Sequence, residues 1–191
     1  WDTFKGFMVK IVASPFKALG NLLGADPDEI EQIAFDYADT TLVRKQIKSL
    51  DLLLELEQLK PELQIDLHYL NDKTLEKKDV AREISHQLYF EEKNQKASSH
   101  TKDYMEFLAL TTGQDSLLIQ DYEMLLAPPA KADSLLEFRE SLRITKIKDY
   151  LSEKNDSTGI RLFDYNEEEV LNIGSRPRFD VRYLLAEEAQ E

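Results

Sequence analysis

Leu63-Gln64-Ile65-Asp66-Leu67-His68-Tyr69 is the stretch of sequence that decides the fold, because apolar and polar residues alternate along it. Successive side chains of a strand point to opposite faces, so this period predicts a strand with one buried face. A helical pattern over residues 41–60 precedes it, and Pro61 separates the two because proline cannot continue a helix. The same alternation over residues 30–37 predicts an earlier strand. Strand, helix and strand with short connections are typical of a layered α/β domain.

The rest of the chain adds helices and then two more strands. Helical spacing of apolar residues and turn signals predict the following elements: helices at 1–11, 15–23, 74–92, 103–110, 116–126 and 133–154, and strands at 160–165 and 179–185. The expected fold is a layered α/β (α+β) domain, in which helices pack on a four-stranded mixed sheet. An all-helical insertion separates the second strand from the last long helix.

These elements divide the sequence into five expected parts. They are an amphipathic amino-terminal helical segment (1–24), a first half-domain (28–73), a helical insertion (74–132), a second half-domain (133–186) and an acidic tail (187–191). We expect the first segment to pack on a neighbouring domain, with binding to a membrane surface as the alternative.

Composition restricts the function. The 191 residues include 24 basic and 37 acidic side chains, a net charge of -13 that repels phosphate backbones, so nucleic acid is not an expected partner. Cysteine is absent, which excludes disulfides and thiolate chemistry. No stretch has the roughly 20 apolar residues that cross a bilayer. Because the sequence starts at Trp1 inside a helical pattern, we expect membrane or export signals upstream.

Short motifs at the joints of these elements resemble the OmpA-like domain. They are Phe35-Asp36-Tyr37-Ala38 in the first strand, Asn71-Asp72 after the second, Ser141-Leu142-Arg143 and Lys148-Asp149-Tyr150-Leu151 in the long helix, and Gly174-Ser175-Arg176-Pro177-Arg178-Phe179-Asp180-Val181 at the last strand. Ser14-Pro15-Phe16-Lys17-Ala18-Leu19-Gly20 and the helical insertion are similar to a narrower group, the OmpA-like ends of large AsmA-like envelope proteins.

The resemblance implies a peptidoglycan site at Asp72 and Arg143. OmpA-like domains hold diaminopimelate with an aspartate and an arginine, because a carboxylate binds an ammonium and a guanidinium forks onto a carboxylate. Here Tyr69 and Leu70 replace the family's usual Gly and His, and the insertion separates the two candidate residues. The alternative is structural: Asp72 caps the following helix and Arg143 pairs with a neighbour such as Glu140.

No pattern in the sequence predicts catalysis, a cofactor or a metal. Of the three histidines, only His86 lies in a ligand-like spacing, with Glu83, and carboxylate-bridged di-metal bundles need that spacing twice. Asp66 and His68 share a strand face, and we expect either a solvated sheet edge or a helix-covered polar pair there. Gly-rich phosphate loops and nucleophile elbows are missing from the sequence.

The resemblance therefore implies a non-catalytic periplasmic binding or scaffolding module, at the carboxyl-terminal end of a membrane-anchored AsmA-like protein. Such proteins serve outer-membrane assembly or lipid transport between the membranes. The implied partners are the preceding domain of the same protein, peptidoglycan and an outer-membrane protein. The alternative is a protein-interaction or structural cap whose OmpA-like pocket no longer binds.

Overall fold

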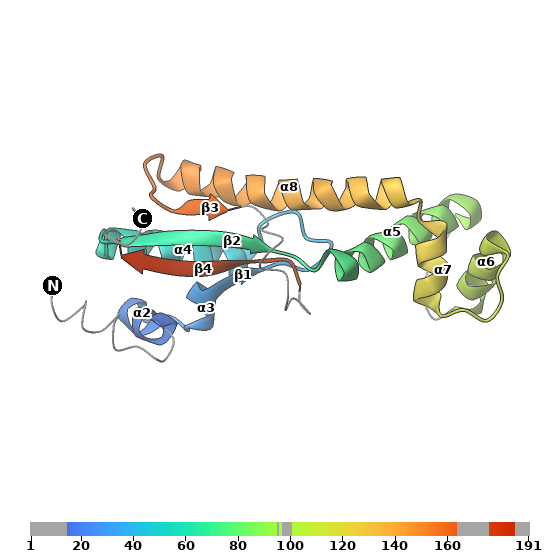
Figure 1. The fold of residues 1–191 in the computed structure, drawn as a ribbon, viewed down its shortest axis with the longest axis horizontal. Helices are drawn as coiled ribbons and strands as arrows, with labels where there is room; N and C mark the ends of the chain where they lie inside the picture. The colour runs from blue at the N-terminus through green and yellow to red at the C-terminus, as the bar shows by residue number, and fades with distance from the viewer. Residues whose placement is uncertain (1–14, 95, 97–100, 164–175, 186–191) are drawn as a thin grey trace.

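A four-stranded mixed sheet organises the computed structural model, which describes residues 15–94, 96, 101–163 and 176–185. The strands are β1 (Gln32–Ala34), β2 (Leu63–Leu70), β3 (Arg161–Phe163) and β4 (Arg178–Leu185), in the order β1-β4-β2-β3. β4 runs antiparallel to β1 and β2, whereas β3 runs parallel to β2. The predicted four-stranded mixed sheet with packed helices is confirmed (Figure 1).

Helices pack against this sheet and extend beyond its end. Those near the sheet are α2 (Pro15–Leu23), α3 (Asp28–Glu31), α4 (Arg44–Leu59) and the long α8 (Pro129–Lys154). Between β2 and α8 the chain forms α5 (Lys73–Lys93), α6 (Lys102–Thr112) and α7 (Ile119–Leu126), which lie past the end of the sheet (Figure 1).

The main hydrophobic core lies on one face of the sheet. The alternating residues of β2 that start at Leu63 turn to this face and pack with leucines of α4 and with Ile147 and Leu151 of α8. Leu67, at the centre, is 0% exposed and lies opposite Leu162 in β3 and opposite Val181 in β4. The period-two pattern predicted from sequence therefore identifies the buried face.

The opposite face of the sheet is polar. Asp66 accepts hydrogen bonds from Arg161 at 2.8 and 2.7 Å, and the ring of His68 stacks on Phe163 with 4.6 Å between centroids. Asp66 and His68 share this face as predicted, but each pairs with a residue of β3.

The helices α5, α6 and α7, which we call the excursion, have small cores of their own. Ala127, Ala132 and Leu136 pack against Val80 and neighbouring residues of α5. Aromatic residues of α5, α6 and α7 form another cluster: Tyr89, Tyr104, Phe107 and Tyr122 with Leu108. Because α8 supplies residues to the sheet core and to the excursion, it joins the two (Figure 1).

Several element boundaries differ from the prediction, among them those of the first strand and of α8. The first strand covers residues 32–34 rather than 30–37, because the residues before it form α3. Ile30 is buried in this helix, and its carbonyl accepts a hydrogen bond from Tyr183 Oη at 2.7 Å. α8 starts at Pro129 rather than near residue 133, since a proline at the first helical position lacks only an N–H that would have no helical partner there.

Several predictions lie outside the described residues, including the helix at 1–11, the acidic tail at 187–191 and most of the loop at 166–178. Gly24 ends α2 with φ of 63°, a left-handed conformation that favours glycine. Within the described part of the chain, no helix combines the length and the apolar character that a bilayer crossing requires.

We predict that Leu67→Ala lowers the free energy of unfolding by about 2–5 kcal/mol, because it opens a cavity at the centre of the sheet core. The matched control is Leu110→Ala in α6, where the side chain is 76% exposed, and the expected change is within about 0.5 kcal/mol. Urea titration followed by circular dichroism measures both. Equal losses would contradict this location of the core.

Candidate functional site

Two arginines interrupt the buried face of α8. The buried residues of this helix, spaced by three or four, are Ala132, Leu136, Arg139, Arg143, Ile147 and Leu151. The first two belong to the core of the excursion and the last two to the core of the sheet. The guanidinium groups therefore lie at the junction of two apolar regions, where a charge needs a partner.

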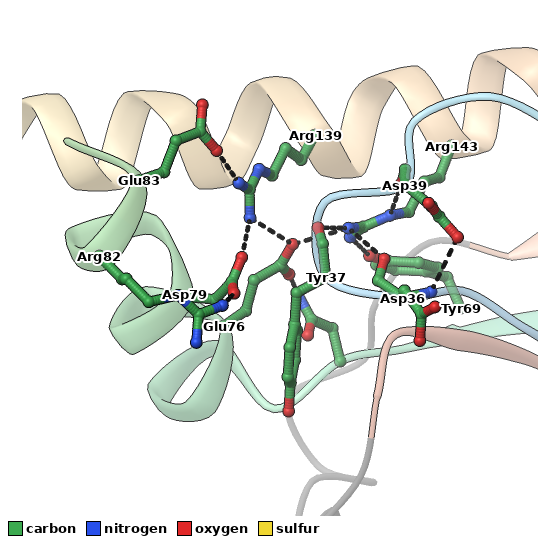
Figure 2. A network of polar contacts seen from close by, with 11 residues as sticks. Asp36, Tyr37, Asp39, Tyr69, Glu76, Asp79, Arg82, Glu83, Arg139 and Arg143 are labelled. Carbon is green, nitrogen blue, oxygen red and sulfur yellow. Dashed lines mark hydrogen bonds and ion pairs between the residues drawn. The ribbon is translucent and has the colours of Figure 1, made fainter. Parts of the chain in front are cut away.

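Arg143 is 0% exposed and is held from three directions. Its Nε donates to the carbonyl of Asp39 at 2.8 Å, and Nη1 donates to Tyr69 Oη of β2 at 3.0 Å. Nη2 donates to Glu76 Oε1 of α5 at 2.8 Å and to the carbonyl of Tyr37. One side chain of α8 thus fixes the loop after β1, the end of β2 and the start of α5 (Figure 2).

Glu76 is the buried anion of this network. It is also 0% exposed, and in addition to Arg143 it accepts a hydrogen bond from Asn71 Nδ2 through its second oxygen. Arg139 Nη1 lies 3.7 Å from Glu76 Oε1. Because Glu76 belongs to the first turn of α5, its negative charge also interacts favourably with the helix dipole.

The surroundings change the pKa values of Arg143 and Tyr69. Burial alone would lower the pKa of Arg143, but the hydrogen bond to Glu76 and the contact with Tyr69 outweigh it, so the pKa is raised. Burial also raises the pKa of Tyr69, against the opposing effect of Arg143. Arg143 therefore stays a cation and Tyr69 a neutral hydroxyl that can accept its hydrogen bond.

Arg139 extends the network along α5. Its Nη1 lies 3.1 Å from Asp79 Oδ2 and its Nη2 donates to Glu83, while Arg82 pairs with Asp79 on the outer side (Figure 2). Glu83 of the Glu-x-x-His spacing is thus an ion-pair partner of Arg139.

Asp72 caps α5, as the structural alternative predicted. Its Oδ1 accepts hydrogen bonds from the backbone N–H groups of Thr74 and Leu75, both at 3.0 Å. The partner of Arg143 is Glu76 rather than Glu140, which instead lies 3.7 Å from Lys73 Nζ. The structure therefore gives the two predicted ligand residues separate partners within the fold.

Sequence reasoning missed Glu76, Asn71 and Arg139. One signal was present: Arg139 and Arg143 continue the helical spacing that links Leu136 to Ile147, so the pattern itself puts them on the buried face of α8. An arginine at such a position predicts a buried carboxylate elsewhere in the chain.

A second polar cluster joins the helices of the excursion. Glu123 of α7 is 2% exposed and accepts a hydrogen bond from Tyr104 Oη of α6 at 3.0 Å. His86 Nε2 of α5 lies 3.9 Å from Glu123 Oε1. Burial raises the pKa of Glu123 and lowers the pKa of His86, so burial favours the neutral form of both groups.

Comparison with known proteins gives no further guide: no family model, no curated protein and no solved structure matches this chain. Among the residues that the structure describes, His, Asp and Glu side chains form no cluster of three that could hold a metal ion. The Glu76–Arg139–Arg143 network joins residues of α5 and α8 by hydrogen bonds and ion pairs, and its geometry is that of a structural junction.

We predict that Arg143→Met lowers the free energy of unfolding by about 3–5 kcal/mol, because it leaves buried Glu76 without its closest cation. Arg82→Met, at an exposed ion pair, is expected to cost under about 1 kcal/mol. Urea titration of Arg143→Met, Glu76→Gln and the double variant is expected to give a coupling energy of about 1–3 kcal/mol. Additive effects would show that the two residues act independently.

We predict that Glu123→Gln raises the free energy of unfolding at pH 8 and that this increase becomes smaller towards pH 5. The raised pKa of Glu123 means that the folded state binds its proton more tightly than the unfolded chain. Ionised Glu123 therefore costs stability above its folded pKa, and the cost vanishes as the pH falls towards the usual value near 4.5. Thermal unfolding of the wild type and the variant at several pH values measures the difference in stability between them. A difference that does not change with pH would contradict the raised pKa of Glu123.

Proposed function

We propose that this chain is a non-catalytic scaffolding module of the bacterial cell envelope that acts through protein contacts. One observation carries the proposal: Arg143, the candidate ligand residue, is 0% exposed and its N–H groups donate hydrogen bonds to other groups of the same chain. To fork onto a ligand carboxylate, it would have to release Glu76 and backbone carbonyls of the loop after β1. Leaving such buried groups unpaired is costly.

Asp72 supports the same conclusion. Its carboxylate already satisfies two N–H groups at the start of α5, which otherwise have no helical partner. The pair that the OmpA-like resemblance implies for diaminopimelate thus has structural roles here, Asp72 at the helix cap and Arg143 at the junction of the cores. This favours the protein-interaction or structural-cap alternative over cell-wall anchoring.

The place of action within this proposal is the periplasm, in a membrane-anchored AsmA-like protein. It is supported by the sequence motifs at the joints of the sheet and by the similarity of residues 14–20 to that group. The module would position the upstream part of the same protein during outer-membrane assembly or lipid transport. An outer-membrane protein is the proposed further partner.

We predict that the purified protein does not sediment with diaminopimelate-containing sacculi above its level without sacculi. Asp72→Ala is expected to lower the free energy of unfolding by about 0.5–2 kcal/mol through the lost cap, without changing sedimentation.

Asp72→Asn separates the two roles, because asparagine also caps helices but carries no charge. Saturable sedimentation of the wild type that Asp72→Asn abolishes, at unchanged stability, would overturn the proposal in favour of peptidoglycan binding.

A further inference from the structure

A cavity of about 370 Å³ opens between the end of α5 and α6, away from the sheet. Its apolar lining is Tyr89, Phe107 and Leu110. The rings of Tyr89 and Phe107 pack edge to face with 5.2 Å between centroids, inside the aromatic cluster of the excursion. Both rings are almost fully buried, at 3% and 4% exposed, so they form the floor of the cavity and Leu110 supplies most of its accessible apolar surface.

Leu110 continues this floor to the surface. Its side chain is 76% exposed, and a large exposed leucine beside a cavity gains free energy when a partner covers it. The cavity volume falls within the range of about 300–1,000 Å³ that is usual for binding pockets. One bulky aliphatic or aromatic side chain of a partner fits this combination.

The rim of the cavity is acidic. Among the described residues that line it, Glu92, Asp103 and Glu106 contribute three carboxylates and Lys93 one ammonium, which lies 2.6 Å from Glu92 Oε1. The whole chain has a net charge of -13, so its long-range field also attracts cations. A basic partner is therefore favoured over an acidic one, and a second copy of this acidic chain is repelled.

We propose that this cavity binds a basic segment of a partner protein, with one large apolar side chain against Phe107 and Leu110 and with Lys or Arg residues facing the acidic rim. The inference rests on the proposed scaffolding function and names the chemistry of its partner. The surface lies on the part of the molecule farthest from the sheet, where α6 closes the excursion (Figure 1). A partner there does not disturb the main core.

The test uses fluorescence anisotropy of a labelled lysine-rich peptide with a central Leu-Phe pair, titrated with the full chain. Leu110→Ser and Glu106→Lys are expected to weaken binding by about tenfold, as the loss of one anchoring contact does. The matched controls are Leu118→Ser, a change at another leucine that is 75% exposed, and Glu153→Lys, a change at an exposed acid of α8. Both controls are expected to bind within about twofold of the wild type.

Control peptides separate the contributions. Replacing the Leu-Phe pair by two alanines, or the lysines by glutamates, is expected to abolish most of the binding. Equal losses in the Leu110 and Leu118 variants, or undiminished binding of the alanine peptide, would overturn the proposal.

A concentration-dependent dimer in size-exclusion chromatography that Leu110→Ser abolishes would also overturn the proposal, because a second copy of the chain would then occupy the cavity. Sacculus sedimentation tests the scaffolding proposal separately, so failure of the peptide test leaves that result unaffected.

Discussion

The fold depends on a buried ion pair that joins two hydrophobic cores. Glu76 and Arg143 are both fully buried, and their charges are compensated by each other, by Arg139, Asn71 and Tyr69, and by backbone carbonyls. Such a pair adds little net stability compared with apolar packing, but it penalises wrong arrangements. If α8 slid by one turn, about 5.4 Å, an apolar residue, Leu136 or Ile147, would take one of the two arginine positions, and the buried carboxylate network would lose one of its two cations. The pair therefore fixes the register of α8 against the sheet and α5.

This role explains why retained charges are an incomplete guide to a retained site. The features that let an arginine hold a ligand carboxylate, a planar fork with a permanent charge, also let it hold a glutamate and a set of loop carbonyls. Only burial distinguishes the two uses. Here the loop after β1 and the first turn of α5 close over Arg143, so the groups that a ligand would supply come from the chain itself.

Much of the architecture was predictable because it depends on local patterns. Alternation along residues 63–69 identified the central strand, and Pro61 and Gly24 marked the ends of helices. The helix cap at Asp72 follows from its neighbours, and it was anticipated as an alternative. The partner of Arg143 was not, since Glu76 lies 67 positions away and only the assembled fold brings them together. The early end of β1 has the same origin, because carbonyls of Tyr37 and Asp39 serve Arg143 instead of a sheet ladder.

The length of α8 has a mechanical consequence. Its 26 residues form a rod of about 39 Å at the usual rise per residue. After Pro129 it contains neither glycine nor proline, the residues at which helices commonly bend. One end is anchored among the helices of the excursion, and the other leads within a few residues to β3 at the sheet edge. Because the same unbroken helix packs in both cores, we expect a displacement of the excursion to be transmitted along α8 to the sheet.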